Sequence, residues 1–231
     1  MPRPSRNLDR ALLAAGRELF PHRGCAGLSV REVADIAGVN LGMFHYHFKS
    51  RETFLRSVMQ SAYEEMFATL TMTMQEVATA NEDAVASLRR ALRVIARFVR
   101  DNRAFLGRVL ADALSGEACA CDFLRDNLPR HLGVLHALVA RGQQEGRLAE
   151  IPVPQAVATC AGALAMPILF GGALLDMNAL APPLAKVVEA SLVSDAGIDQ
   201  RIELVLRAIS RDAAPIGAAV AKPTRKQRGK P

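Results

Sequence analysis

The chain has 231 residues, of which 50% are hydrophobic and 5% aromatic, and its formal net charge is +6. This length is enough to bury a substantial core, and a composition rich in Ala and Leu favours a helical protein over a β-sandwich or barrel. Positive charge gathers at the two ends: residues 1–60 hold nine Lys/Arg against five Asp/Glu, and residues 211–231 hold six against one. We therefore expect a polyanionic partner at the ends of the chain and not along its middle.

The first 28 residues are predicted to form a basic arm, over residues 1–7, and then one amphipathic helix. Apolar residues recur at helical spacing from Leu8 onward. Pro21 is expected to end or distort this helix, and Gly24 and Gly27 mark the loop that follows.

The next stretch, residues 29–49, is predicted to form two short helices joined by a tight turn. Ser29 begins the first of them, because Glu32 follows at the spacing of a capping box. Val33, Ile36 and Ala37 give that helix one apolar face, and Gly38 ends it. This arrangement presents the second helix to a DNA major groove.

The second helix of this pair carries the side chains that suit contacts with DNA. Asn40 is predicted to cap it, and Phe44 and Phe48 to form its inward face. The remaining side chains supply imidazole, phenol, ammonium and apolar groups, which suit phosphates, base edges and thymine methyl groups. His47 is left open between a DNA contact and a core histidine.

The rest of the chain is predicted to be helical, up to a basic tail over residues 212–231. Ser50 caps the next helix, which is long enough to leave the head, and Asn81 is predicted to cap the helix after it. The tail either adds phosphate contacts or only increases solubility. The helix after Asn81 is predicted to end near Arg100. Further helices are predicted over residues 102–114, 121–141 and 198–209.

Residues 151–175 contain no charged side chain and are long enough to cross a bilayer. The stretch also contains three prolines and many small residues, and it lacks aromatic belts and flanking basic clusters. We therefore predict a buried or subunit-interface helix and no membrane partner. Gly162 on this helix and Ile202 and Leu206 on the last helix are predicted to form the interface of a homodimer.

The cysteines are Cys25, Cys119, Cys121 and Cys160. Because the N-terminus is polar and basic, we expect a reduced, cytoplasmic setting. No second Cys/His cluster accompanies Cys119 and Cys121, so ordinary thiols are favoured over a redox or metal pair. The sequence also lacks the motifs of catalytic nucleophiles and phosphate loops, and we expect no enzyme, no cofactor and no metal.

Residues 8–60 resemble the TetR family of transcriptional regulators. The similarity rests on spaced positions that agree in order: Leu19-Phe20, Gly24, Val33-Ala34, Ala37-Gly38-Val39, Gly42, Phe48 and Ser50. Two positions depart from the family pattern, where His45 stands for the usual Tyr and Arg51 for the usual Lys. The remaining chain resembles the family only in its length and helical character.

The resemblance implies an all-α protein with a three-helix DNA-binding head, residues 8–50, and a helical effector-binding and dimerisation domain, residues 51–211. It implies a repressor that binds a palindromic operator on double-stranded DNA as a dimer and is released by a small, largely apolar effector. A nonspecific, nucleoid-type DNA-binding protein is the alternative. The residues implied to contact DNA are Ser29, Asn40, Leu41, Gly42, Met43, His45, Tyr46, His47 and Lys49. Candidate pocket residues, chosen as flexible apolar or polar side chains of the middle helices, are Met66, Phe67, Phe98, Asn102, Phe105, His131, Met166 and Phe170.

Overall fold

The computed structural model describes residues 6–212, and it confirms the all-helical class. Within that range the chain forms ten α-helices and one π-helix, with an isolated β-bridge between Leu148 and Ser210 and no strand. The predicted basic tail, apart from Asp212, and most of the predicted arm lie outside the described residues. The α-helices are α1 (Arg6–Gly27), α2 (Val30–Ile36), α3 (Leu41–Phe48), α4 (Arg51–Thr79), α5 (Ala84–Asp101), α6 (Arg103–Leu114), α7 (Ala118–Gln144), α8 (Val153–Asp176), α9 (Pro182–Val188) and α10 (Asp195–Ala208), and the π-helix is η1 (Glu189–Val193).

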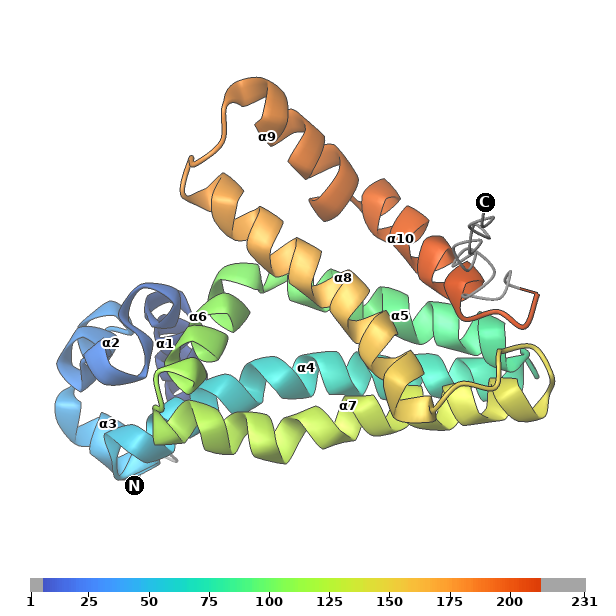
Figure 1. Ribbon diagram of the computed structural model, residues 1–231. Coiled ribbons are helices and arrows are strands. Elements are labelled where there is room, and N and C mark those ends of the chain that lie inside the picture. The colour runs from blue at the N-terminus through green and yellow to red at the C-terminus, as the bar shows by residue number, and fades with distance from the viewer. Residues whose placement is uncertain (1–5, 213–231) are drawn as a thin grey trace, which may run out of the picture.

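Helices α1 to α3 form a compact head at one end of the molecule (Figure 1). Phe44 and Phe48 are buried, and their rings lie 5.0 and 4.9 Å from the ring of Phe54 at the start of α4. The predicted inward face of α3 is therefore confirmed. These edge-to-face contacts fix the exposed side of α3 relative to the body.

Local capping sets the ends of the head helices as the sequence predicts. The Ser29 hydroxyl accepts a hydrogen bond from the Glu32 amide at 3.5 Å, and Asn40 Oδ1 accepts from the Met43 amide at 2.9 Å. Ser50 caps α4 in the same way through the Thr53 amide, at 3.1 Å. Each bond satisfies a backbone N–H that has no partner inside its own helix.

Three details of the head differ from the prediction. Helix α1 begins at Arg6 and continues past Pro21 to Gly27, with its break at Gly24, whose φ is 63°. Pro21 removes only one backbone N–H donor, and the kink at Gly24 lets helical geometry continue to Gly27. Ile36 is 48% exposed, so the inward face of α2 is formed by Val33 and Ala34 instead.

The body is a helical layer in which α4 runs from the head along α5 and α7 (Figure 1). Asp83, and not Asn81, caps α5 by accepting from the Ala86 amide at 2.8 Å. Asn81 instead has a φ of 51° in the turn after α4, a conformation that Asn tolerates better than most residues. Helix α7 begins at Ala118, so its first turn already includes Cys119 and Cys121.

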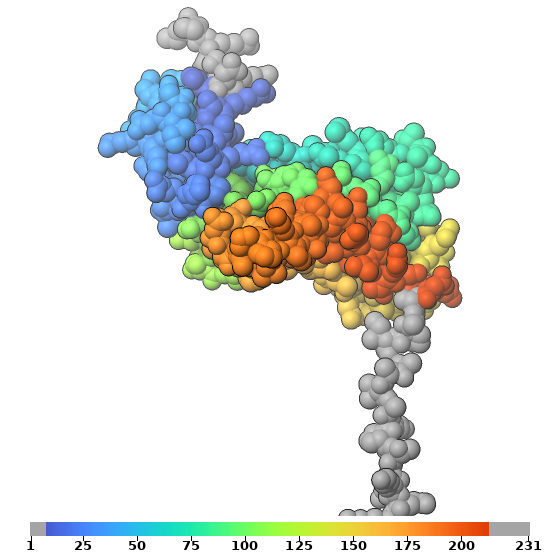
Figure 2. All heavy atoms as spheres, turned by 90° about the horizontal axis from the view of Figure 1, so that it is seen from above, coloured from blue at the N-terminus to red at the C-terminus, as the bar shows by residue number. Residues whose placement is uncertain are grey.

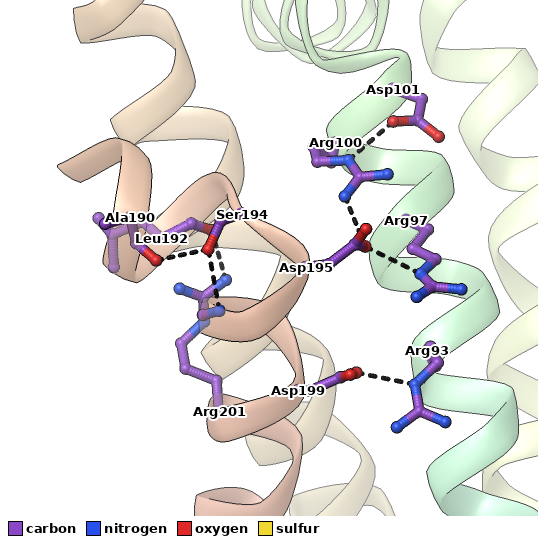
Figure 3. Close-up of polar contacts among 11 residues, drawn as sticks. Arg93, Arg97, Arg100, Asp101, Ala190, Leu192, Ser194, Asp195, Asp199 and Arg201 are labelled. Carbon is purple, nitrogen blue, oxygen red and sulfur yellow. Dashed lines mark hydrogen bonds and ion pairs between the residues drawn. The ribbon is translucent and has the colours of Figure 1, made fainter. Parts of the chain in front are cut away.

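Helices α8 to α10 and η1 form a second layer over the body (Figures 1 and 2). The segment α9–η1 was not predicted. Arginines of α5 face acidic residues of α10: Arg93 pairs with Asp199 at 2.7 Å, and Arg97 and Arg100 pair with Asp195 at 3.0 and 2.7 Å (Figure 3). Arg201 donates to the carbonyls of Ser191 and Leu192, which ties α10 to η1.

Candidate DNA-binding surface and ligand cavity

The outer face of α3 is polar and exposed, as a DNA-reading helix requires. Tyr46 is 64% exposed and Leu41 40% exposed, and Gly42, His45 and Lys49 are exposed as well. The buried phenylalanines on the other side leave these groups free to meet base edges and phosphates. Five of the nine candidate residues are thus exposed on α3 or directly after it.

The other four candidates have further roles within the head. The side-chain oxygens of Ser29 and Asn40 hold the helix caps, although both residues are exposed. Met43 is half-buried against the core. His47 is half-buried too, and its Nε2 atom is buried without a hydrogen-bond partner among the described residues.

Arg51 holds the end of α1 to the start of α4. Its guanidinium donates to the carbonyls of Leu28 and Ala26 at 2.8 and 2.7 Å and also to the carbonyl of Cys25. A planar group with several donors suits three neighbouring carbonyls. The departure from Lys that the sequence shows here therefore serves the packing of the head.

The head is also attached to α6, through a buried carboxylate. Asp112 is 4% exposed, and its Oδ2 accepts a hydrogen bond from the Cys25 amide at 2.6 Å. Its Oδ1 pairs with Arg108 at 2.9 Å. Gly24 has a positive φ that favours glycine, and a Cβ atom there would overlap the Arg108 guanidinium and force it to move.

A cavity of about 300 Å³ lies between α4, α5, α6, α7 and α8. Four of the eight predicted pocket residues line it: Met66, Phe98, Phe105 and His131. The sequence missed most of the lining, because leucines and alanines of α6, α7 and α8 have the same spacing as ordinary core residues. The missed residues include Tyr63, Leu106, Val109, Phe123, Asn127 and Leu135.

The other four predicted pocket residues lie elsewhere. Phe67 packs under the guanidinium of Arg130, 4.1 Å from its ring centroid, and Asn102 faces a separate groove between α4 and α5. Met166 and Phe170 are 53% and 68% exposed on the outer side of α8. The pocket prediction was wrong for these positions because helical spacing alone does not show which side of a helix faces inward.

The cavity has one polar corner, made by Tyr63, Asn127 and His131. The Tyr63 hydroxyl donates to the Asn127 carbonyl at 2.8 Å and lies 3.2 Å from Nδ1 of His131. Burial raises the pKa of Tyr63 to about 12 and lowers the pKa of His131. Both side chains are therefore uncharged near neutral pH.

The predicted dimer interface needs correction at two positions. Ile202 and Leu206 are 0% and 4% exposed within the single chain, because that face of α10 packs against α5 and α8. These side chains are not available to a partner. Gly162 is exposed on α8, with no atom within 4 Å of the position of a Cβ.

Exposed apolar residues recur along α8 and again on α9: Gly162, Met166, Phe170, Met177, Leu184 and Val187. Helix α8 is also the one helix among the described residues that is long and apolar enough to span a membrane. We call this set the α8–α9 face.

The thiols of Cys25 and Cys119 are neighbours, across the junction of α1 and α7, a proximity that the sequence analysis did not predict. The interaction with Cys25, followed by the positive charges of Arg56 and Arg51, lowers the pKa of Cys119 against the opposing effect of burial. The pKa of Cys25 is raised by Cys119, by burial and by Asp112. All four cysteines are free thiols.

The fold and the outward surface of α3 define a helix–turn–helix protein with a helical sensor-type body. Residues 12–58 match the sequence family of bacterial regulatory proteins, tetR family. This match identifies the N-terminal segment as a TetR-type DNA-binding head. The described residues also share the fold of solved TetR-family regulators.

Named relatives agree with this placement. The chain is 31% identical over 65 residues to the HTH-type transcriptional repressor DhaR of Mycobacterium sp. (strain GP1), a match that covers 28% of this chain and about a third (33%) of that repressor. A candidate fatty acid metabolism regulator from Clostridium perfringens has the same fold, with a TM-score of 0.66 and 19% identity over 89% of this chain and 99% of that one. The transcriptional regulator FadR of Bacillus subtilis, solved with stearoyl-CoA, has a TM-score of 0.56 and 19% identity over 80% of this chain and 97% of that one.

Proposed function

We propose that this protein is a transcriptional repressor that binds a palindromic operator as a homodimer and releases it when an apolar effector enters the cavity. The observation that carries the proposal is that one helix, α6, serves both sites. Phe105 and Val109 line the cavity, and Asp112, one turn further along, holds the head at Cys25. The FadR complex with stearoyl-CoA supports a small-molecule effector by analogy of fold.

A second contact strengthens the link between cavity and head. The ring centroid of Phe105 lies 4.8 Å from that of Phe20, a fully buried residue of α1. A ligand that displaces Phe105 must therefore disturb the packing of α1 as well as the cavity wall. An effector changes operator affinity only if it binds the two orientations of the head with different affinity, and this contact gives it the means.

The dimer is formed through the α8–α9 face in this proposal. A contiguous exposed apolar surface marks an interaction site more often than a free surface. The small side chain of Gly162 lets a partner helix approach closely, and Phe170 supplies an aromatic anchor. A dimer presents two copies of α3 to successive major grooves, which a palindromic site requires. Such a regulator acts in the cytoplasm, where its DNA lies.

Selection of bound fragments from the source organism's DNA tests this function. The expected result is enrichment of a palindromic sequence whose half-sites lie about one helical turn apart. The Tyr46→Ala variant should lose this enrichment, and the His136→Ala variant, changed at an exposed position of α7, should keep it. Enrichment without any shared sequence would contradict the proposal and favour nonspecific binding.

A further inference from the structure

The cavity is suited to an uncharged ligand, because nothing in its wall neutralises a charge. Among the described residues, its lining contains no Asp, Glu, Lys or Arg. Arg130 lies beside the polar corner, where it donates to Asn127 Oδ1 at 3.3 Å and covers the rings of Tyr63 and Phe67. Its charge is already paired, because the guanidinium contacts the Glu64 carboxylate at 2.5 and 3.1 Å. Transfer of a carboxylate or phosphate from water into such a site is costly without a paired cation.

The polar corner has its hydrogen bonds fixed in a definite pattern. The single proton of the Tyr63 hydroxyl is given to the Asn127 carbonyl, so this hydroxyl can only accept from His131. The Asn127 amide is fully occupied: it donates to Gln60 and to the Phe123 carbonyl, at 3.0 and 2.9 Å, and accepts from Gln60 at 3.1 Å. Neither residue has a group left for a ligand.

This pattern determines the state of the His131 ring. Nδ1 lies 3.2 Å from the Tyr63 oxygen, whose own proton goes to the Asn127 carbonyl, and so Nδ1 carries the proton. Burial disfavours the imidazolium, which leaves the neutral tautomer with a lone pair on Nε2. Nε2 makes no hydrogen bond within the described part of the chain, and the His131 ring lines a cavity whose wall is otherwise almost entirely apolar.

We propose that the cavity binds an uncharged hydrocarbon ligand with a hydroxyl group, which donates a hydrogen bond to Nε2 of His131. This inference rests on the proposed function, since it names the chemical class of the effector for the same cavity. An alcohol satisfies the lone pair and needs no counterion. A carboxylate has no proton to donate, so its lone pairs would repel the lone pair of Nε2. The cavity lining also contains no Lys or Arg to neutralise its charge.

Three probes of similar size separate these possibilities in calorimetric titrations of the full chain at pH 8 without DNA. They are 1-octanol, its isomer 1-methoxyheptane, which has no donor, and octanoate. We expect 1-octanol to bind roughly five- to tenfold more tightly than the ether, the effect of one buried hydrogen bond, and octanoate to bind most weakly. Equal or tighter binding of the ether or of octanoate would overturn the proposal, as would no binding of any probe. This ranking uses the unmodified protein and needs no variant to fold.

The variant His131→Phe tests the residue itself. It should bind 1-octanol and the ether with equal affinity, and its affinity for the ether should change less than about twofold. The matched variant His136→Phe, on the same helix but outside this cavity, should keep the preference for the alcohol. A preference that survives in His131→Phe would assign the hydrogen bond to another group.

The outcomes also separate this inference from the proposed function. If 1-octanol binds with the expected preference but leaves operator affinity unchanged, the ligand class stands and the role of the cavity in repression is wrong. If octanoate binds more tightly and releases the operator, the repressor function stands and the ligand class is wrong.

Discussion

The Cys25 amide donates a 2.6 Å hydrogen bond to the buried carboxylate of Asp112, and this bond joins the DNA-binding head to the helix that lines the ligand cavity. The two residues lie 87 positions apart in the chain. Around them, Arg108 pairs with the same carboxylate and fills the space left by Gly24. The head therefore cannot turn on the body without changing this group of contacts.

Replacement of Asp112 tests the strength of the junction. Asp112→Ala leaves the Cys25 amide and the Arg108 guanidinium without their partner, and a buried unsatisfied group costs about 1–3 kcal/mol. We expect a loss of at least this size in the free energy of unfolding, measured by urea denaturation. Asp112→Asn keeps an acceptor for the amide and should lose less. Equal stability of Asp112→Ala and the unmodified protein would contradict this role.

Substitutions on the two sides of α3 should affect different properties, operator affinity on the exposed side and stability on the buried side. Tyr46→Ala removes an exposed side chain and should weaken operator binding by about 1–3 kcal/mol, the usual value of a base contact, without changing the melting temperature. Phe44→Ala empties a fully buried position and should lower the free energy of unfolding by about 3–5 kcal/mol. Fluorescence anisotropy and thermal denaturation measure the two effects. A Tyr46→Ala variant with full affinity would remove this residue from the DNA surface.

A charge on the α8–α9 face should separate the subunits. Phe170→Glu places a carboxylate at a 68% exposed position that the dimer would bury, so the variant should sediment as a monomer and bind the operator weakly. Leu114→Glu is the control, since Leu114 is 81% exposed at the end of α6 and lies outside this face. If both variants remain dimeric, the interface lies elsewhere.

The thiols should differ in reactivity. The pKa of Cys119 is lowered and the side chain is half-buried, whereas burial raises the pKa of Cys160 to about 11 and that residue is fully buried. Because the thiolate is the nucleophile, iodoacetamide at pH 7.5 should alkylate Cys119 long before Cys160. Mass spectrometry of digests over time measures the order. Cys25→Ser should slow the alkylation of Cys119, since the interaction between the two thiols favours the Cys119 thiolate.

Acid should weaken the attachment of α10 to α5. The guanidinium of Arg100, with that of Arg97, holds the pKa of Asp195 below its ordinary value of 3.8. A carboxyl whose pKa is lowered by folding stabilises the folded state above its ordinary pKa, and this contribution disappears as the pH falls through the folded value. The stability of Asp195→Asn should therefore differ from that of the unmodified protein at pH 7, and the difference should shrink as the pH falls below the ordinary pKa of 3.8. The difference at pH 7 should be small, because the pair is exposed and screened by salt.

Local signals in the sequence predicted the head well, and long-range packing decided the body. Ser29, Asn40 and Ser50 act within three residues of themselves, so their caps could be recognised from spacing alone. The inward side of α10 depends on where α5 and α8 lie, which spacing does not show, and Ile202 and Leu206 were placed at the wrong interface for that reason. The cavity and its polar corner are likewise set by tertiary packing.

The bond between Cys25 and Asp112 had no signal in the sequence. It depends on a break in α1 at Gly24 and on the position of α6, which are both properties of the folded chain. From the sequence alone, an Asp in a helix such as Asp112 is expected to be an ordinary surface residue.

Specific binding to one DNA sequence is the central claim, and the most direct measurement compares the selected operator with a scrambled duplex of the same length by fluorescence anisotropy over a series of salt concentrations. A repressor should bind the operator at least about a thousandfold more tightly than the scrambled DNA at physiological salt, and the scrambled complex should weaken steeply as salt rises. Equal affinity for the two duplexes at every salt concentration would contradict the claim.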